Sequence, residues 1–237
     1  MPIGSNPIDA TPAPPDPRDI PDATVARLPE YLHALHTLSE AGEKTISSEG
    51  LAAAAGVNSA KLRKDLSHLG SYGVRGVGYD ITSLATHISS VLGLTRHRSV
   101  ALVGAGHLGA ALAGYAGFTK RGFAIVAMFD VAPELVGTTV GGLPVHHIDQ
   151  LHKVVGAEGI SIAIITTPPS AAQRVADSLV KAGVTSILNF APCVLDVPDN
   201  VDVRKVDLAI EMQILSFHEH RKARDNAAIA QSVDKVA

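Results

Sequence analysis

Residues 100–112, VALVGAGHLGAAL, decide the class of fold to which this chain belongs. An apolar segment typical of a buried parallel strand leads directly into Gly104, Gly106 and Gly109, and a helical pattern follows. In such a G-x-G-x-x-G loop the first glycine allows a tight turn, the second lets the backbone approach a pyrophosphate, and the third lets the helix pack closely on the strand. The alternative is a glycine turn that serves packing alone.

An acidic residue follows at the spacing that a dinucleotide site requires. Asp130 ends the next apolar segment, residues 123–130, and comes 21 residues after Gly109. A carboxylate there can accept hydrogen bonds from both hydroxyls of an adenosine ribose, and it repels a 2′-phosphate. The two features together predict NAD(H) rather than NADP(H). They also argue against a CoA-binding module, because the ribose of CoA is phosphorylated.

Strand-like and helical segments alternate after Asp130. Residues 160–166 (ISIAIIT) and 185–190 (TSILNF) are typical of buried strands, and residues 170–183 of a helix. This alternation predicts a Rossmann domain over residues 96–206, with a parallel sheet covered on both faces and a ligand at the carboxyl ends of its strands. The residues predicted to contact NADH or NAD+ in this domain are Gly104, Ala105, Gly106, His107, Leu108, Gly109, Asp130, Thr166, Thr167, Pro168, Asn189 and Phe190.

The sequence before residue 95 is organised differently. Apolar residues recur at spacings of three and four over residues 25–38, which indicates a helix that begins at Pro29 or is kinked there. Residues 46–70, ISSEGLAAAAGVNSAKLRKDLSHLG, are typical of a helix, a turn and a second helix, the arrangement of a DNA-binding helix-turn-helix. The residues expected to cap or end these two helices are Ser48, Gly56, and Asn58 or Ser59.

The second of these helices concentrates positive charge in a chain whose formal net charge is −3. Residues 61–75 carry +3, so the rest of the chain carries −6. A solvated charged face is the alternative explanation, but the second helix of a helix-turn-helix is the one that enters the groove of DNA. At about 100° per residue, Leu62, Leu66 and Leu69 share one side, and the opposite side is expected to hold Lys61, Lys64, Asp65 and His68, with Arg63 on the flank.

Within this helix Asp65 is expected to orient a neighbouring basic side chain rather than to face DNA. Residues 70–79, GSYGVRGVGY, then predict a small hairpin with Arg75 near its tip, which suits a narrow minor groove where negative potential is enhanced. Helix-turn-helix and hairpin together predict a winged-helix domain over residues 21–95. The residues predicted to contact DNA are Ser59, Lys61, Arg63, Lys64 and Arg75, with Arg63 and Lys64 the first choices for the groove.

A terminal helix is predicted in residues 207–237, the region of a dimerisation helix and tail. Its apolar residues form two stripes about 200° apart, one made of Leu208, Met212 and Leu215 and the other of Ile210, Ile214 and Phe217. A helix that is apolar on opposite sides is normally held between two surfaces. We therefore predict a domain-swapped homodimer in which the partner subunit supplies one surface. Burial within a single subunit is the alternative.

Several features bound the remaining possibilities. The chain has 237 residues with a single cysteine, Cys193, and no run of 18 apolar residues, which favours a cytoplasmic protein and argues against a membrane span. Residues 1–20 are expected to form a disordered, Pro-rich tail. The histidines show no ligand-like pairing, so no metal site is predicted; His146, His147 and His152 are placed in a turn-helix region. Cys193 is interpreted as a small hydrophobic residue rather than a redox-active thiol.

The motifs quoted above resemble those of the bacterial redox-sensing repressors called Rex. The resemblance runs from about residue 20 to about residue 221, and its most specific blocks are RKDLS at 63–67 and RGVGY at 75–79. It implies a homodimeric repressor that binds a palindromic operator when NADH is scarce. It also implies that NADH closes the dimer and releases the DNA, whereas NAD+ competes without causing release.

The resemblance also implies roles for individual residues. Tyr115 and Asp207 match a pair near the nicotinamide that is linked to sensing the redox state. His33 stands where the family often has an arginine that helps to couple the domains, so this coupling is expected to differ here.

The alternative function is an NAD-dependent oxidoreductase with a small accessory domain. It requires a general acid–base in the nucleotide cleft, and none is evident. After Pro192 only about 45 residues remain, too few for a substrate domain by usual sizes. No catalytic residue is therefore predicted.

Overall fold

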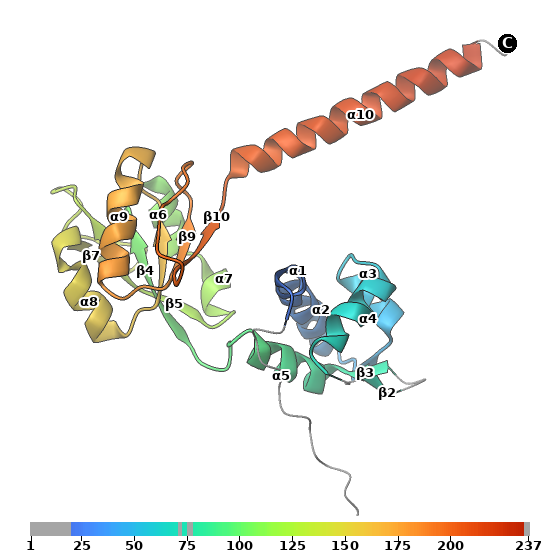
Figure 1. Ribbon diagram of the computed structural model, residues 1–237, viewed down its shortest axis with the longest axis horizontal. Helices are drawn as coiled ribbons and strands as arrows, with labels where there is room; N and C mark the ends of the chain where they lie inside the picture. Colours follow the sequence, from blue (N-terminus) through green and yellow to red (C-terminus); the bar gives the residue numbers. More distant parts are fainter. Residues whose placement is uncertain (1–19, 71–72, 75–77, 235–237) are drawn as a thin grey trace, which may run out of the picture. The chain divides into compact units, whose positions relative to one another are not determined.

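The computed structural model describes residues 20–70, 73–74 and 78–234 (Figure 1). The chain divides into two compact units, Met1–Arg96 and His97–Ala237. The predicted tail lies outside the described residues except for Ile20, whose side chain is buried in the core of the first unit. In the part of the chain that is described, no helix is both long and apolar enough to cross a membrane.

The first unit is a winged helix, as predicted. A three-stranded antiparallel sheet of order β1-β3-β2 flanks the helix-turn-helix, with its first strand before the two helices in sequence and the other two strands after them. Its strands are β1 (Thr45–Ile46), β2 (Gly73–Val74) and β3 (Gly78–Asp80). Its helices are α1 (Asp22–Val25), α2 (Leu28–Glu40), α3 (Ser48–Ala54), α4 (Ser59–Ser67) and α5 (Ile81–Val91).

Local sequence explains where the helices of this unit begin. The hydroxyl of Ser47 accepts a hydrogen bond from the Gly50 N–H at 3.0 Å, so Ser47 caps α3 and the prediction of Ser48 was wrong by one residue. The cap must have an extended backbone, whereas Ser48 is already helical. Asn58 caps α4, accepting from the Ala60 N–H at 2.8 Å. Pro29 occupies the first turn of α2, where its missing N–H costs nothing.

The core of this unit is built from large apolar residues, among them Leu62 and Leu69, which the helical spacing placed on the buried side of the second helix. They come from four helices and from the segment that follows α4, so each helix buries one face against the others. The members that are almost completely buried are Leu28, Tyr31, Leu35, Leu51, Leu62, Leu69, Ile81, Leu84 and Ile88.

The second unit is the predicted Rossmann domain. Its sheet has the order β10-β9-β8-β4-β5-β7-β6, with all neighbouring strands parallel except β6 and β7. Without β6 this is the strand order 3-2-1-4-5-6 of dinucleotide-binding folds. The strands are β4 (Arg98–Val103), β5 (Phe123–Asp130), β6 (Thr139–Val140), β7 (Leu143–His147), β8 (Ile162–Ile165), β9 (Ser186–Asn189) and β10 (Asp202–Lys205).

Helices cover both faces of this sheet. On one face α8 and α9 contribute buried side chains such as Leu151 and Leu179, and on the other α6 and α7 contribute the partly buried Leu112 and Phe118. The bounds of these elements are α6 (His107–Ala113), α7 (Ala116–Thr119), the 3-10 turn η2 (Ile148–Gln150), α8 (Leu151–Glu158) and α9 (Pro169–Lys181).

The histidine pair corrects one prediction. His146 and His147 end strand β7 rather than lying in a turn-helix region, and His146 is paired in register with Phe129 of β5. The His146 and Phe129 rings lie 5.7 Å apart. Because β7 is short and contains a proline, its pairing with the neighbouring strands β5 and β6 is what makes it a strand.

Helix α10 (Leu208–Asp234) ends the described chain. All six residues of its two apolar stripes are exposed, with fractions from 44% for Ile210 to 66% for Met212. Burial of both stripes within one subunit is therefore not what the single chain shows.

Candidate functional site

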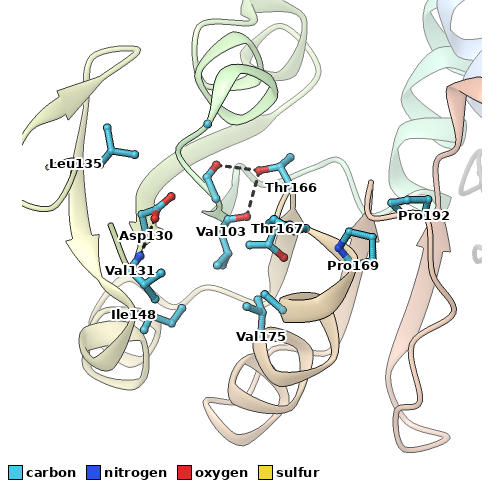
Figure 2. Close-up of a pocket in the computed structure, with 14 residues that line it drawn as sticks. Val103, Asp130, Val131, Leu135, Ile148, Thr166, Thr167, Pro169, Val175 and Pro192 are labelled. Atoms are coloured by element: carbon cyan, nitrogen blue, oxygen red, sulfur yellow. Dashed lines mark hydrogen bonds between the residues drawn. The ribbon is translucent and has the colours of Figure 1, made fainter. Parts of the chain in front are cut away.

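A cavity of about 520 Å³ lies at the carboxyl ends of the parallel strands, where the strand order reverses between β4 and β8 (Figure 2). Ligands of open α/β sheets bind at such switch points. The cavity is lined by Val103, Gly104, Gly106, Asp130, Val131, Leu135, Ile148, Thr166, Thr167, Pro168, Pro169, Ala171, Val175 and Pro192.

The three glycines of the loop serve different purposes. Gly104 has a φ of +108°, and a Cβ there would lie 2.8–2.9 Å from atoms of Thr166. A Cβ at Gly109 would lie 1.9 Å from the carbonyl oxygen of Gly104, so α6 can approach β4 only without one. Gly106 is different: no heavy atom lies within 4 Å of its Cβ position, and it lines the cavity. The protein does not itself require a glycine at 106, whereas a bound pyrophosphate does.

The carboxylate of Asp130 is fixed by the backbone around it. Oδ2 accepts a hydrogen bond from the Ala105 N–H at 2.7 Å, and Oδ1 accepts from Val131 and Ala132 at 2.7 and 2.9 Å. A carboxylate has about four acceptor positions, so one remains on Oδ2. This arrangement leaves capacity for one ribose hydroxyl, compared with the two expected from sequence, and it locks the glycine loop to the end of β5.

The two threonines after β8 differ in the same way as the glycines. The Thr166 hydroxyl donates to backbone carbonyls at the end of β4, at 2.8 Å to Gly104 and within 3.1 Å of Val103, and so holds the loop in place (Figure 2). The hydroxyl of Thr167 is buried in the cavity wall and has no hydrogen-bond partner among the described residues. Because a buried hydroxyl without a partner is costly, Thr167 is the polar group that a ligand would satisfy.

Asn189 and Phe190 take structural positions at the end of β9. The Asn189 side chain is buried, accepting from the Ala191 N–H at 2.9 Å and donating to the Cys193 carbonyl at 3.0 Å. Its amide therefore shapes the loop that carries Pro192. The sequence predicted that Asn189 contacts the nucleotide, but Asn189 does not line the cavity. Phe190 is partly buried against the sheet core.

Tyr115 and Asp207 have separate partners in the single chain. The exposed Tyr115 ring packs edge-on against Phe118, with centroids 5.2 Å apart, and lies over Gly117, whose Cβ position is 2.4 Å from the ring. Asp207 caps α10 through the Ala209 N–H and pairs with Lys205 at 3.2 Å. The hydrogen bond from Lys205 lowers the pKa of Asp207.

Sequence reasoning missed the apolar walls of the cavity. Val131 is 65% exposed directly after Asp130, a position where an apolar side chain in water indicates a ligand surface. The sequence contained a sign of this, because an apolar valine directly follows the aspartate that ends the strand. His107 and Leu108 open α6 beside the cavity without lining it, and Ala105 contributes its N–H to Asp130. The other lining residues that were not predicted are Val103, Leu135, Ile148, Pro169, Ala171, Val175 and Pro192.

The recognition helix α4 presents its basic residues to solvent. Lys61, Arg63 and Lys64 are exposed, and Ser59 at the first position of the helix is half-buried. The Arg63 guanidinium donates through Nη1 to the Glu49 carboxylate of α3 at 2.8 Å. The prediction for Arg75 concerns a residue outside those that the structure describes.

Asp65 corrects the assignment of helix faces. It is 2% exposed and lies on the buried side of α4, not on the side of Lys64. Its charge is balanced by Arg27, which comes 38 residues earlier. Asp65 does orient a basic side chain, as predicted, but that side chain belongs to the segment before α2 rather than to its own helix.

A winged helix with an exposed basic recognition helix, joined to a Rossmann domain with a nucleotide-sized cavity, defines a ligand-responsive DNA-binding regulator. A family model described as "CoA binding domain" matches residues 95–193, and one described as "Putative DNA-binding protein N-terminus" matches residues 19–67. The redox-sensing transcriptional repressor Rex of Streptomyces griseus is 63% identical over 89% of this chain and 83% of its own length. The Rex protein of Streptomyces avermitilis is 61% identical over 93% and 87%. The chain belongs to the Rex family of redox-sensing transcriptional repressors.

Solved structures agree with this family. A crystal structure of RSP in complex with β-NAD+ and operator DNA has a TM-score of 0.81 and 33% identity, covering 87% of this chain and 95% of that one. RSP in complex with β-NADH has a TM-score of 0.78 and 32% identity, covering 87% and 97%. The prediction of a regulator rather than an oxidoreductase is thus confirmed.

Proposed function

We propose that this chain represses transcription in the cytoplasm in response to the ratio of NADH to NAD+. It binds a palindromic operator when NADH is scarce and dissociates when NADH occupies the Rossmann cavity. The relatives that are more than 60% identical are named redox-sensing repressors, and RSP was crystallised with NADH and with NAD+ plus operator DNA.

The single observation that carries this proposal is the fit of the cavity to a dinucleotide. Gly106 leaves open space where a pyrophosphate would approach, Thr167 offers a buried hydroxyl without a protein partner, and Asp130 keeps one acceptor position. A phosphate on the adenosine ribose would be repelled by the negative charge of Asp130, which disfavours CoA and NADP(H). If the glycine loop served packing alone, neither the open space at Gly106 nor the unpaired hydroxyl of Thr167 would be needed.

Helix α10 supports a homodimer. Its two apolar stripes, on opposite sides, are exposed along Leu208–Phe217 in the single chain. Leaving six large apolar side chains in water is unfavourable by about 25 cal/mol for each Å² that a partner would cover. A partner subunit of the same chain, exchanging α10, would cover both stripes and would give the twofold symmetry that a palindrome requires.

The nucleotide can control DNA binding only if the two redox states favour different dimer geometries. NADH and NAD+ differ by a hydride and by the positive charge on the nicotinamide ring. We propose that Tyr115 and Asp207 discriminate between them, with Asp207 held ionised by Lys205 and by the N-terminus of α10. A coupling of about 1–3 kcal/mol would change operator affinity about 5–150-fold.

The test is a gel shift with the full chain on the promoter region of its own gene, at stated salt, titrated with NADH and with NAD+. Release by NADH and competition without release by NAD+ are expected. Failure of the protein to bind any duplex, or release by both nucleotides alike, would contradict the proposal. In Tyr115→Phe and Asp207→Ala the difference between the nucleotides should shrink; unchanged behaviour would remove these two residues from the sensing role.

A further inference from the structure

Asp65 is the one acidic side chain that is buried among the described residues, and it lies in the recognition helix. Its immediate neighbour in sequence, Lys64, is exposed and is a predicted DNA contact. A buried carboxylate in this helix requires an explanation, because taking a charge out of water is costly unless it is paired and fully hydrogen-bonded.

The partners of Asp65 fill all of its acceptor positions. Arg27 donates through Nε to Oδ2 and through Nη2 to Oδ1, both at 2.6 Å, which is a two-pronged ion pair. Tyr31 donates its hydroxyl to Oδ2 at 2.6 Å, and Thr24 donates to Oδ1 at 3.0 Å. The three donors come from α1, from α2 and from the turn between them, so the network joins the start of the domain to α4.

Such a network is a poor way to gain stability. Replacing a buried ion pair by apolar residues of similar volume is often neutral or stabilising. Apolar side chains, however, pack in many orientations, whereas a planar guanidinium and a carboxylate meet in one plane. What the network adds beyond apolar packing is a fixed direction for the Asp65 side chain.

That direction fixes the DNA-facing side of α4. Successive residues of a helix are about 100° apart, so the rotation that points Asp65 at Arg27 also sets where Arg63 and Lys64 point. The apolar residues Leu62 and Leu66 define the buried side only broadly, because leucines tolerate rotation of a helix better than a two-pronged ion pair does.

We propose that Asp65, Arg27, Tyr31 and Thr24 form a positioning network that sets the rotation of the recognition helix and thereby determines operator specificity. This inference rests on the proposed function, since it assumes that α4 enters a DNA groove. It assigns Asp65 to positioning: the residue acts on DNA only through the neighbouring basic side chains.

The decisive variant is the double replacement Asp65→Leu with Arg27→Met, which removes both charges and keeps the site filled. Asp65→Asn and Tyr31→Phe remove single parts of the network. Ile88→Val on α5 is the control, because it trims the same core without touching the network. Each full-length variant is measured for thermal unfolding, NADH affinity, and affinity for two duplexes: one selected by the wild-type protein from a random pool, and one of scrambled sequence.

If the network positions α4, the double variant stays folded and binds NADH normally, because the cavity lies in the other compact unit. Its affinity for the selected duplex falls about 5–150-fold, as for one lost base contact, while its affinity for the scrambled duplex is unchanged. Ile88→Val lowers stability without altering the ratio of the two affinities.

Two results would overturn the inference. One is a folded double variant that keeps the wild-type ratio of affinities. The other is a ratio of affinities that falls in Ile88→Val as much as in the double variant, because the fall would then reflect lost stability rather than lost positioning. Failure of the wild-type protein itself to select any duplex would instead contradict the proposed function, so the two failures are distinguishable.

Discussion

The nucleotide cavity and the recognition helix are both binding surfaces, but they are built by opposite means. In the cavity the backbone shapes the phosphate-facing part: a glycine loop is locked by Thr166 and Asp130, and few polar side chains are left for the ligand. On α4 the side chains are proposed to meet DNA, and beneath them the buried Asp65, paired with the partly buried Arg27, is proposed to fix their direction. A surface made by backbone tolerates no added atoms, whereas a surface made by side chains depends on what lies under it.

The largest effect is expected in the glycine loop. In Gly109→Ala the new methyl group would meet the Gly104 carbonyl, so the Rossmann unit should lose roughly 3 kcal/mol of stability together with its NADH affinity. Gly106→Ala should unfold at the wild-type temperature and still bind NADH poorly, because its Cβ meets only the ligand. Calorimetry and thermal unfolding measure both quantities. Normal NADH affinity in Gly106→Ala would show that the pyrophosphate lies elsewhere.

Substitutions of the exposed basic residues of α4 should weaken DNA binding without lowering the stability of the fold. Arg63→Ala should weaken operator binding about 5–150-fold and relax specificity at one base position, if its guanidinium reads a base edge. Lys61→Ala should weaken binding to all duplexes alike and lower the salt slope by about 1, if its ammonium contacts a phosphate. Gel shifts at several salt concentrations separate the two outcomes. If Arg63→Ala weakens binding to the selected and scrambled duplexes equally, the Arg63 side chain contacts a phosphate rather than a base.

A pH titration tests the hydrogen-bond network around Asp65 in the first unit. Burial, and then the hydrogen bond to Asp65, raise the pKa of Tyr31 to about 12 from an unfolded value of about 10. The raised pKa means that the folded state favours the neutral phenol. The resulting stability is therefore complete below about pH 10 and is lost as the pH rises towards about 12. Tyrosinate absorbance of wild type and Tyr31→Phe should differ by one late-titrating tyrosine. Titration of that tyrosine at its ordinary pKa would contradict the buried hydrogen bond.

The smallest effect is expected at Glu49. Its own backbone N–H, followed by the hydrogen bond from Arg63, lowers the pKa of Glu49, so a charged carboxylate lies beside a predicted DNA contact. Glu49→Gln should raise affinity for scrambled DNA by no more than about fivefold, since surface ion pairs contribute little, and should reduce discrimination in favour of the operator. Competition between the two duplexes measures this. Weaker binding to scrambled DNA would show that Glu49 does not repel phosphates.

Much of the fold followed from local patterns. The G-x-G-x-x-G loop, Asp130 and the apolar strands predicted the Rossmann domain because each is a contiguous signal. Strands β7 and β10 gave no such signal: β7 contains Pro144 and two histidines, and β10 reads DVRK. Both are strands because a neighbouring strand offers them hydrogen bonds, which is a tertiary cause.

The candidate site divides in a similar way. Six of the predicted residues line the cavity, because strand ends in a parallel sheet meet at one edge. The apolar walls from Leu135, Ile148 and Val175 could not be predicted, since they come from elements whose placement depends on packing. The same holds for Asn189, whose amide turns towards its own loop.

The sequence by itself determined the two domain types, the family and the positions of the charged and glycine-rich segments, because periodicity and motif spacing are local properties of the chain. Only the tertiary structure decided which of those residues face a ligand. Helical spacing placed Asp65 on the outer side of its helix, but the residue is buried, and its burial depends on an arginine 38 residues away in sequence. The glycine motif assigned Gly106 to the pyrophosphate and Gly109 to helix packing, and the structure supplies the physical reason. A Cβ at Gly109 would meet the backbone carbonyl of Gly104, whereas no heavy atom lies within 4 Å of a Cβ at Gly106.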